Sequence, residues 1–155
     1  MKVTLLVVGK TTDKHLEVLI EDYVERIGHY LPFEIKVIPE LKNVKALSQA
    51  QQKTMEGELI LKAVGTTEVI LLDEHGKERR SIEFADWMNK KMSAGRDLTF
   101  VIGGPFGFSE AVYQRAEGQI SLSLMTFSHQ MIRLLFTEQM YRALTIIRGE
   151  KYHHE

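Results

Sequence analysis

The residues with the clearest chemical potential form a glycine-rich turn. The apolar run at 98–102 leads directly into Gly103-Gly104-Pro105-Phe106-Gly107, and Ser109 then opens a helix. Glycine at a junction between a strand and a helix allows a positive φ or the close approach of a ligand. Many α/β proteins bind nucleotide-like ligands at such junctions, outside the carboxyl ends of the strands. The pattern therefore predicts either a ligand loop or a tight turn that binds nothing.

The spacing of these glycines excludes two familiar phosphate-binding loops. A dinucleotide loop needs the pattern G-x-G-x-x-G, whereas Pro105 stands inside this turn and removes a backbone donor. A P-loop needs a Lys-Ser or Lys-Thr pair after its last glycine, and none follows Gly107. A ligand at this turn would therefore be held in another way.

A second candidate segment runs from Ser121 to His129, where serine and apolar residues alternate. Alternation of this kind predicts a strand, here at 119–125, and Ser128 is a suitable N-cap for the helix that follows. As a loop, the same segment can offer main-chain donors and acceptors to a flat heterocycle. Leu122 and Met125 would then form an apolar slot for that ring.

Titratable side chains gather toward the carboxyl end of the chain. A helix N-terminus disfavours protonation of His129, so we expect a neutral, structural histidine. Glu138 and Arg142 are four residues apart, which is the usual spacing of a stabilising helix pair. Tyr152 and His153 belong either to a frayed end or to a pair that stacks on a base and exchanges protons with it.

Composition limits the possible classes of protein. The 155 residues suffice for one domain with its own core, and we expect a single domain over 1–155. The chain has no cysteine, which fits a reducing cytoplasm and excludes disulfides and thiolate metal sites. We expect no metal, since adjacent histidines near the end point in different directions.

Charge and hydropathy bear on the partners. The 20 basic and 21 acidic residues give a net charge of −1, which argues against a general RNA or DNA binder, although a locally basic face remains compatible with it. The apolar run at the amino terminus is too short to span a membrane and is typical of a buried first strand. We therefore expect neither a DNA partner nor a membrane.

Strands and helices alternate along the chain. This order predicts an α/β fold with a mainly parallel sheet flanked by helices. Periodicity predicts strands at 2–8, 33–37, 69–72, 98–102 and 119–125, and helices at 16–27, 46–64, 82–92, 110–115 and 131–145.

Taken together, these segments resemble a known family. The chain is similar over its whole length to the bacterial large-subunit ribosomal RNA pseudouridine-N3 methyltransferases of the SPOUT superfamily. One departure is Ser128, which stands where these proteins usually carry proline, so the backbone before the helix is less restrained. The matching motifs are Val8-Gly9-Lys10, Ile102-Gly103-Gly104-x-x-Gly107, Ser121-Leu122-Ser123, Met125-Thr126-Phe127-x-His129, Glu138-x-x-Tyr141-Arg142 and Arg148-Gly149-x-x-Tyr152-His153.

The resemblance implies a fold, a methyl donor and an assembly. The carboxyl-terminal part would be tied in a trefoil knot, a rare exception among folds. The protein would be a homodimer, with the last helix in the interface and the tail of one subunit completing the site of the other. The residues that would contact S-adenosylmethionine are Leu72, Gly103, Leu122, Ser123, Leu124, Met125, Thr126 and Phe127.

The resemblance also implies a reaction. The protein would methylate N3 of a pseudouridine in the helix 69 stem-loop of 23S ribosomal RNA, on the assembled ribosome in the cytoplasm. His153, Tyr152 or Glu138 would help to remove the N3 proton, and Arg142 would stabilise negative charge on the flanking carbonyl oxygens. The alternatives are a ribosome-binding or assembly factor of the same fold without enzymatic activity, a small-ligand-binding regulator, and a methyltransferase for another RNA.

Overall fold

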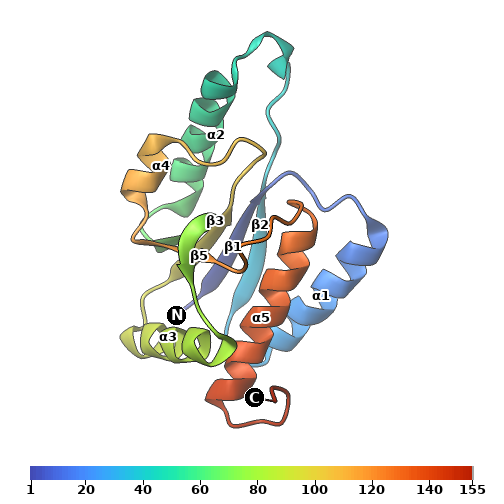
Figure 1. Ribbon diagram of the computed structural model, residues 1–155, viewed down its shortest axis with the longest axis vertical. Helices are drawn as coiled ribbons and strands as arrows, with labels where there is room; N and C mark the ends of the chain where they lie inside the picture. Colours follow the sequence, from blue (N-terminus) through green and yellow to red (C-terminus); the bar gives the residue numbers. More distant parts are fainter. Residues whose placement is uncertain (155) are drawn as a thin grey trace.

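Five parallel strands form the centre of the protein (Figure 1), whose computed structural model describes residues 1–154. Their order in the sheet is β2-β1-β4-β3-β5, and every neighbouring pair is parallel. This arrangement confirms the predicted α/β class. The strands are β1 (Val3–Val8), β2 (Phe33–Ile38), β3 (Glu68–Glu78), β4 (Leu98–Ile102) and β5 (Gly118–Ser121).

Helices cover both faces of this sheet (Figure 1). On one face α5 packs against both α1 and α3, and on the other α2 packs against α4. The helical elements are α1 (Lys14–Gly28), a 3₁₀ turn η1 (Val44–Ala46), α2 (Gln49–Val64), α3 (Ser81–Ala94), α4 (Glu110–Arg115) and α5 (Met131–Ile147). Within residues 1–154, no helix combines the length and the apolar character that crossing a bilayer requires.

Alternation along the strands divides the core in two. In β1, Val3, Leu5 and Val7 face the layer of α1, α3 and α5, whereas Leu6 faces α2 and α4. All five residues of β4 are buried, because this strand lies in the middle of the sheet between two helical layers. A continuous apolar run at 98–102 is therefore what a central parallel strand requires.

Two strand predictions need correction. The strand predicted at 119–125 ends at Ser121, because the Ser121 hydroxyl donates to the Ser123 carbonyl (2.8 Å) and the chain turns there. The strand predicted at 69–72 continues to Glu78 after an irregularity between Leu72 and Lys77. The predicted turn at His75-Gly76 thus lies inside a bulged strand.

Serine side chains set the starts of three helices. Ser48 caps α2, so this helix begins three residues later than predicted. Ser109 caps α4, and its hydroxyl also fills the space beside the buried Gly57, where a Cβ would lie 2.4 Å away. Ser128 accepts from the Met131 backbone N–H (3.1 Å) at the start of α5, as expected. The trefoil knot stays a prediction.

Candidate active site

A cavity of about 610 Å³ opens at the carboxyl ends of β3, β4 and β5. Ile102 and Ser121 are the last residues of β4 and β5, and Leu72 is the last residue of β3 before its irregularity; all three line the cavity. Parallel α/β sheets place their ligands at this edge, because the loops there diverge and leave a crevice. The remaining walls come from the glycine turn, the loop at 122–129 and the amino-terminal end of α2.

The glycine turn is shaped by the protein's own side chains. A Cβ at Gly103 would lie 2.8 Å from the Phe108 ring, and one at Gly104 would lie 2.3 Å from the carboxylate of Glu56. The Gly104 backbone N–H donates to that carboxylate at 2.8 Å, and Gly107 has a φ of 79°. The first two glycines are therefore required by close packing, and the third by its positive φ.

Glu56 is a residue that the sequence analysis missed. It comes from α2, about 50 positions before the turn it holds, and no local pattern marks it. Burial raises the pKa of its carboxyl above the usual range, and the hydrogen bond from Gly104 opposes part of this shift. Glu56 thus fixes one wall of the cavity at the cost of desolvating a carboxylate.

Asp73 was not among the residues predicted for the site, although its place directly after the apolar run at 69–72 is a signal for it. Its carboxylate accepts from the hydroxyl of Tyr113 and, at 2.8 Å, from the His75 backbone N–H. Burial raises the pKa of Tyr113, so this phenol stays protonated at neutral pH and remains a donor. The Asp73–Tyr113 pair forms a polar wall of the cavity.

The loop at 122–127 forms the opposite wall. Ser123 organises it, because its hydroxyl accepts from the Met125 backbone N–H at 2.9 Å. Leu124 does not line the cavity, and its side chain is 77% exposed. The other seven residues expected to contact the methyl donor all line it: Leu72, Gly103, Leu122, Ser123, Met125, Thr126 and Phe127. Their role in donor binding stays a prediction.

His129 and Arg133 join this loop to α5. Partial burial, together with the nearby charge of Arg133, lowers the pKa of His129, in the direction expected for a neutral histidine. Arg133 is 1% exposed and donates to the carbonyls of His129 (3.0 Å) and Val8 (2.9 Å) and to the Thr11 hydroxyl (3.1 Å). This side chain ties the start of α5 to the end of β1.

The four residues expected to be catalytic form one cluster. The Arg142 guanidinium donates to a Glu138 oxygen at 2.6 Å, and the Tyr152 hydroxyl donates to the same oxygen at 3.0 Å. Another Arg142 nitrogen lies 3.1 Å from Nδ1 of His153. Because a guanidinium only donates, Nδ1 accepts this hydrogen bond. Burial, aided by hydrogen bonds with Tyr23 and Glu138, raises the pKa of Tyr152.

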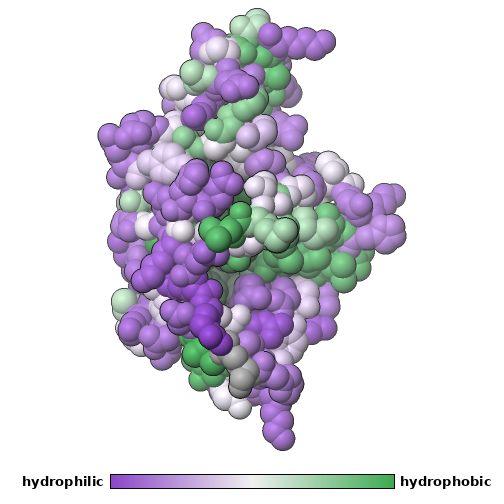
Figure 2. All heavy atoms as spheres, in the orientation of Figure 1, coloured by the Kyte–Doolittle hydropathy of each residue, from purple (hydrophilic) through white to green (hydrophobic). Residues whose placement is uncertain are grey.

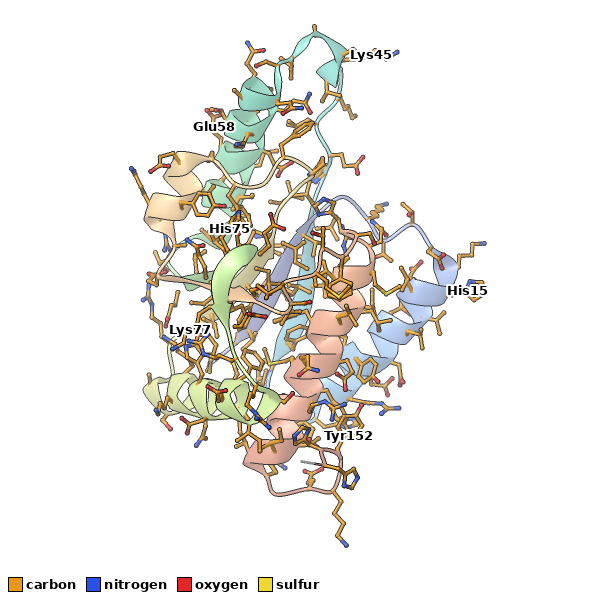
Figure 3. All side chains as sticks on the ribbon, in the orientation of Figure 1. His15, Lys45, Glu58, His75, Lys77 and Tyr152 are labelled. Carbon is orange, nitrogen blue, oxygen red and sulfur yellow. The ribbon has the colours of Figure 1, made fainter. Side chains whose placement is uncertain are left out.

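This cluster lies away from the cavity within one chain. None of its four residues lines the cavity, which α5 reaches at Ile132. Arg142 is ten residues further along α5, or about 15 Å at the helical rise of roughly 1.5 Å per residue. Figure 3 shows Tyr152 beside the carboxyl-terminal half of α5, far from His75 at the cavity. One subunit therefore holds the two parts of the predicted site apart.

A family model described as "Predicted SPOUT methyltransferase" matches residues 1–153. The chain belongs to the SPOUT methyltransferase family. A protein from Bacteroides thetaiotaomicron named "Ribosomal RNA large subunit methyltransferase H" is 61% identical over the whole of both chains. A protein of the same name from Flavobacterium johnsoniae is 54% identical, again over the whole of both chains. The resemblance that the sequence motifs carried is thereby confirmed.

A solved structure supports the fold of this SPOUT chain. A "Probable Methyltransferase" from Bordetella pertussis Tohama I superposes with a TM-score of 0.56 at 11% identity, covering 92% of this chain and 96% of that one. At this identity the likeness concerns the fold alone. Among residues 1–154, no group of three or more histidine and carboxylate side chains is placed to hold a metal ion.

Proposed function

We propose that this protein transfers the methyl group of S-adenosylmethionine to N3 of a pseudouridine in the helix 69 stem-loop of 23S ribosomal RNA, on the assembled ribosome in the cytoplasm. The observation that carries the proposal is the cavity between the glycine turn and the loop at 122–127 in a SPOUT methyltransferase chain. The names of its full-length relatives support a large-subunit ribosomal RNA substrate.

The cavity suits the methyl donor in shape and charge. Leu122, Met125 and Phe127 offer apolar surface to a flat adenine ring, and the turn at 103–104, which has no side chains, lets the ring approach the backbone. Asp73 and Glu74 place two carboxylates on the wall. A donor that carries a sulfonium and an ammonium against one carboxylate has a net positive charge, which these side chains attract.

The side chains around Arg142 have the chemistry that methylation of a pseudouridine base requires. The sulfonium is already a good leaving group, so the main tasks are to hold N3 in line with the methyl group and to remove its proton. Tyr152 stays protonated because its pKa is raised, so it acts as a donor and leaves Glu138 and His153 as candidate proton acceptors. Arg142 stabilises the negative charge that spreads onto the carbonyl oxygens beside N3.

A homodimer would unite the two parts of the site. Each chain keeps the Arg142 cluster away from its own cavity, so the tail of a second copy must supply the cluster. Figure 2 shows hydrophobic surface over the loop before α5 and over α1. The exposed apolar side chains there are Val18, Leu19, Leu124, Met125, Phe127 and Met131. Burial of such a surface favours a two-fold interface.

The test is the methylation of ribosomal RNA in a strain that lacks the gene. Mass spectrometry should show the loss of one methyl group from a modified uridine in helix 69, and the returned gene should restore it. An unchanged methylation pattern would refute the proposal. A non-enzymatic ribosome-binding factor would give the same pattern with and without the gene, and calorimetry would detect no binding of S-adenosylmethionine.

A further inference from the structure

A second cavity of about 450 Å³ lies directly behind one wall of the donor cavity. The two cavities share the segment 120–123 and Phe127 as lining, so a thin layer of chain separates them. The far side of the second cavity is formed by the start of α3 at Ser81 and by Leu135 and Gln139 of α5. The second cavity therefore lies next to the cavity that is expected to hold the methyl donor.

The two cavities differ in charge. Lys77, Arg79 and Arg80 line the second cavity, and no carboxylate does so among the residues that the structure describes. The donor cavity carries the carboxylates of Asp73 and Glu74 instead, with one lysine at its edge. In a chain whose net charge is −1, this concentration of cations is a local feature and not a consequence of composition.

Arg79 holds its guanidinium in a fixed position at this cavity. Its guanidinium lies over the Trp87 ring, 5.4 Å from the ring centre, which fixes the orientation of the side chain. Its Nη1 is shielded from solvent and has no hydrogen-bond partner within residues 1–154. Shielded guanidinium nitrogens normally have an acceptor, so Arg79 keeps unmet hydrogen-bonding capacity beside the cavity. Figure 3 shows Lys77 near α3.

We propose that this second cavity binds a phosphate of the RNA strand next to the acceptor nucleotide. The inference rests on the proposed function, since an RNA substrate must enter the site beside the donor. A phosphodiester backbone carries one negative charge per nucleotide, and lysine and arginine are its usual partners. The donor's own carboxylate is a poorer occupant, because three cations would repel a donor whose net charge is positive.

The start of α3 also borders this cavity, since Ser81 is the first residue of the helix and lines it. The partial positive charge of this helix end is already met by the carboxylate of Glu83, which accepts from the Arg80 backbone N–H at 3.1 Å. The attraction for a phosphate therefore comes from the three cationic side chains.

The experiment compares the double variant Lys77→Gln/Arg79→Gln with wild type and with the control Lys90→Gln. Lys90 lies on α3 outside the cavity and pairs with Asp86 at the surface. With ribosomes that lack the methyl group as substrate, the double variant should raise KM for ribosomes about tenfold and leave kcat within about twofold. The magnitude of the slope of log affinity against log salt should fall by about 0.7–0.9, because one phosphate is no longer neutralised.

Calorimetry with S-adenosylmethionine separates the two possible occupants. We expect the donor Kd of the double variant to equal that of wild type. A weaker donor Kd with an unchanged KM for ribosomes would assign the cavity to the donor's carboxylate and overturn the proposal. The proposal would also be overturned if wild type is active and the double variant has the same KM for ribosomes and the same salt dependence. If wild type transferred no methyl to ribosomes, the proposed function itself would fail, which is a separate outcome.

Discussion

The absence of a side chain at Gly103 and at Gly104 determines how the glycine turn packs. Each leaves space for a group from another part of the chain, the Phe108 ring in one case and the Glu56 carboxylate in the other. The Gly104 N–H is satisfied by that carboxylate, so this part of the turn is held before any ligand arrives. A cavity whose walls are held in this way loses less entropy on binding.

Gly104→Ala should therefore destabilise the protein and weaken donor binding. The added methyl displaces the Glu56 carboxylate and breaks its hydrogen bond with the turn, for a loss of about 1–2 kcal/mol in the free energy of unfolding. Urea unfolding and calorimetry with S-adenosylmethionine measure the two effects. Gly28→Ala is the control, since a Cβ there meets nothing within 4 Å. If Gly104→Ala had the same free energy of unfolding as wild type, the close packing of Glu56 against this glycine would not matter for stability.

Glu56→Gln should make stability less dependent on pH. Burial raises the pKa of Glu56 in the folded state, so the unfolded chain loses this proton first and wild type loses stability as pH rises through the folded-state pKa. The amide bears no charge, so the melting temperature of Glu56→Gln relative to wild type should increase as pH rises from 4.5, the ordinary pKa of this carboxyl, toward neutrality. Glu58→Gln, at an exposed position two residues away, is the control. A constant difference across this range would refute the effect.

At the scale of elements, the start of α5 decides where the site lies. The Ser128 hydroxyl accepts from the first backbone N–H of this helix, and Arg133 connects its first turn to the end of β1 and the following loop through the Val8 carbonyl and the Thr11 hydroxyl. Ser121 ends β5 early, which frees the segment 122–127 to act as a wall of the cavity. The serine-rich segment thus works as a loop, although its alternation is typical of a strand.

Arg133→Met should cost about 2–4 kcal/mol in the free energy of unfolding, because it removes the hydrogen bonds that the buried Arg133 side chain donates to the carbonyls of Val8 and His129. Denaturant unfolding gives the value. Arg26→Met is the matched control, since Arg26 forms an exposed pair with Asp22 on α1 and such pairs contribute about 1 kcal/mol or less. Equal losses in both variants would show that the tether is unimportant.

At the scale of the whole molecule, the site is divided. The donor cavity and the Arg142 cluster lie in different parts of one chain, and the exposed apolar surface over α1 and the loop before α5 offers a place for a second copy. A composite site in a homodimer follows from this separation if the chain is a methyltransferase whose acceptor meets both parts.

Mixed dimers test the composite site. Thr126→Trp should block the donor cavity, and Arg142→Ala should remove the acceptor cluster, so each variant alone is inactive. Refolding an equal mixture should restore about a quarter of wild-type activity, since half of the dimers are mixed and each then holds one intact site. Methyl transfer to ribosomes is the readout, and a mixture of wild type with Arg142→Ala calibrates the exchange. No recovery would place each site within a single chain.

Much of the fold could be predicted from the sequence because the relevant signals are local. The apolar run at 98–102 indicated a strand, and Ser128 indicated the start of the last helix. The family could be recognised as well, since its motifs lie in short contiguous segments. Strand ends were less accessible: β5 stops at Ser121 because of a hydrogen bond that periodicity does not encode.

What the sequence by itself determined is the alternation of strands and helices, the glycine turn and the membership of the SPOUT family. Only the tertiary structure decided that Glu56 holds Gly104, that Tyr113 meets Asp73 and that Arg79 lines a second cavity. Only the tertiary structure decided, too, that the Arg142 cluster stands apart from the cavity in one chain. The physical reason is that local backbone preferences act over a few residues, whereas these contacts depend on how distant segments pack.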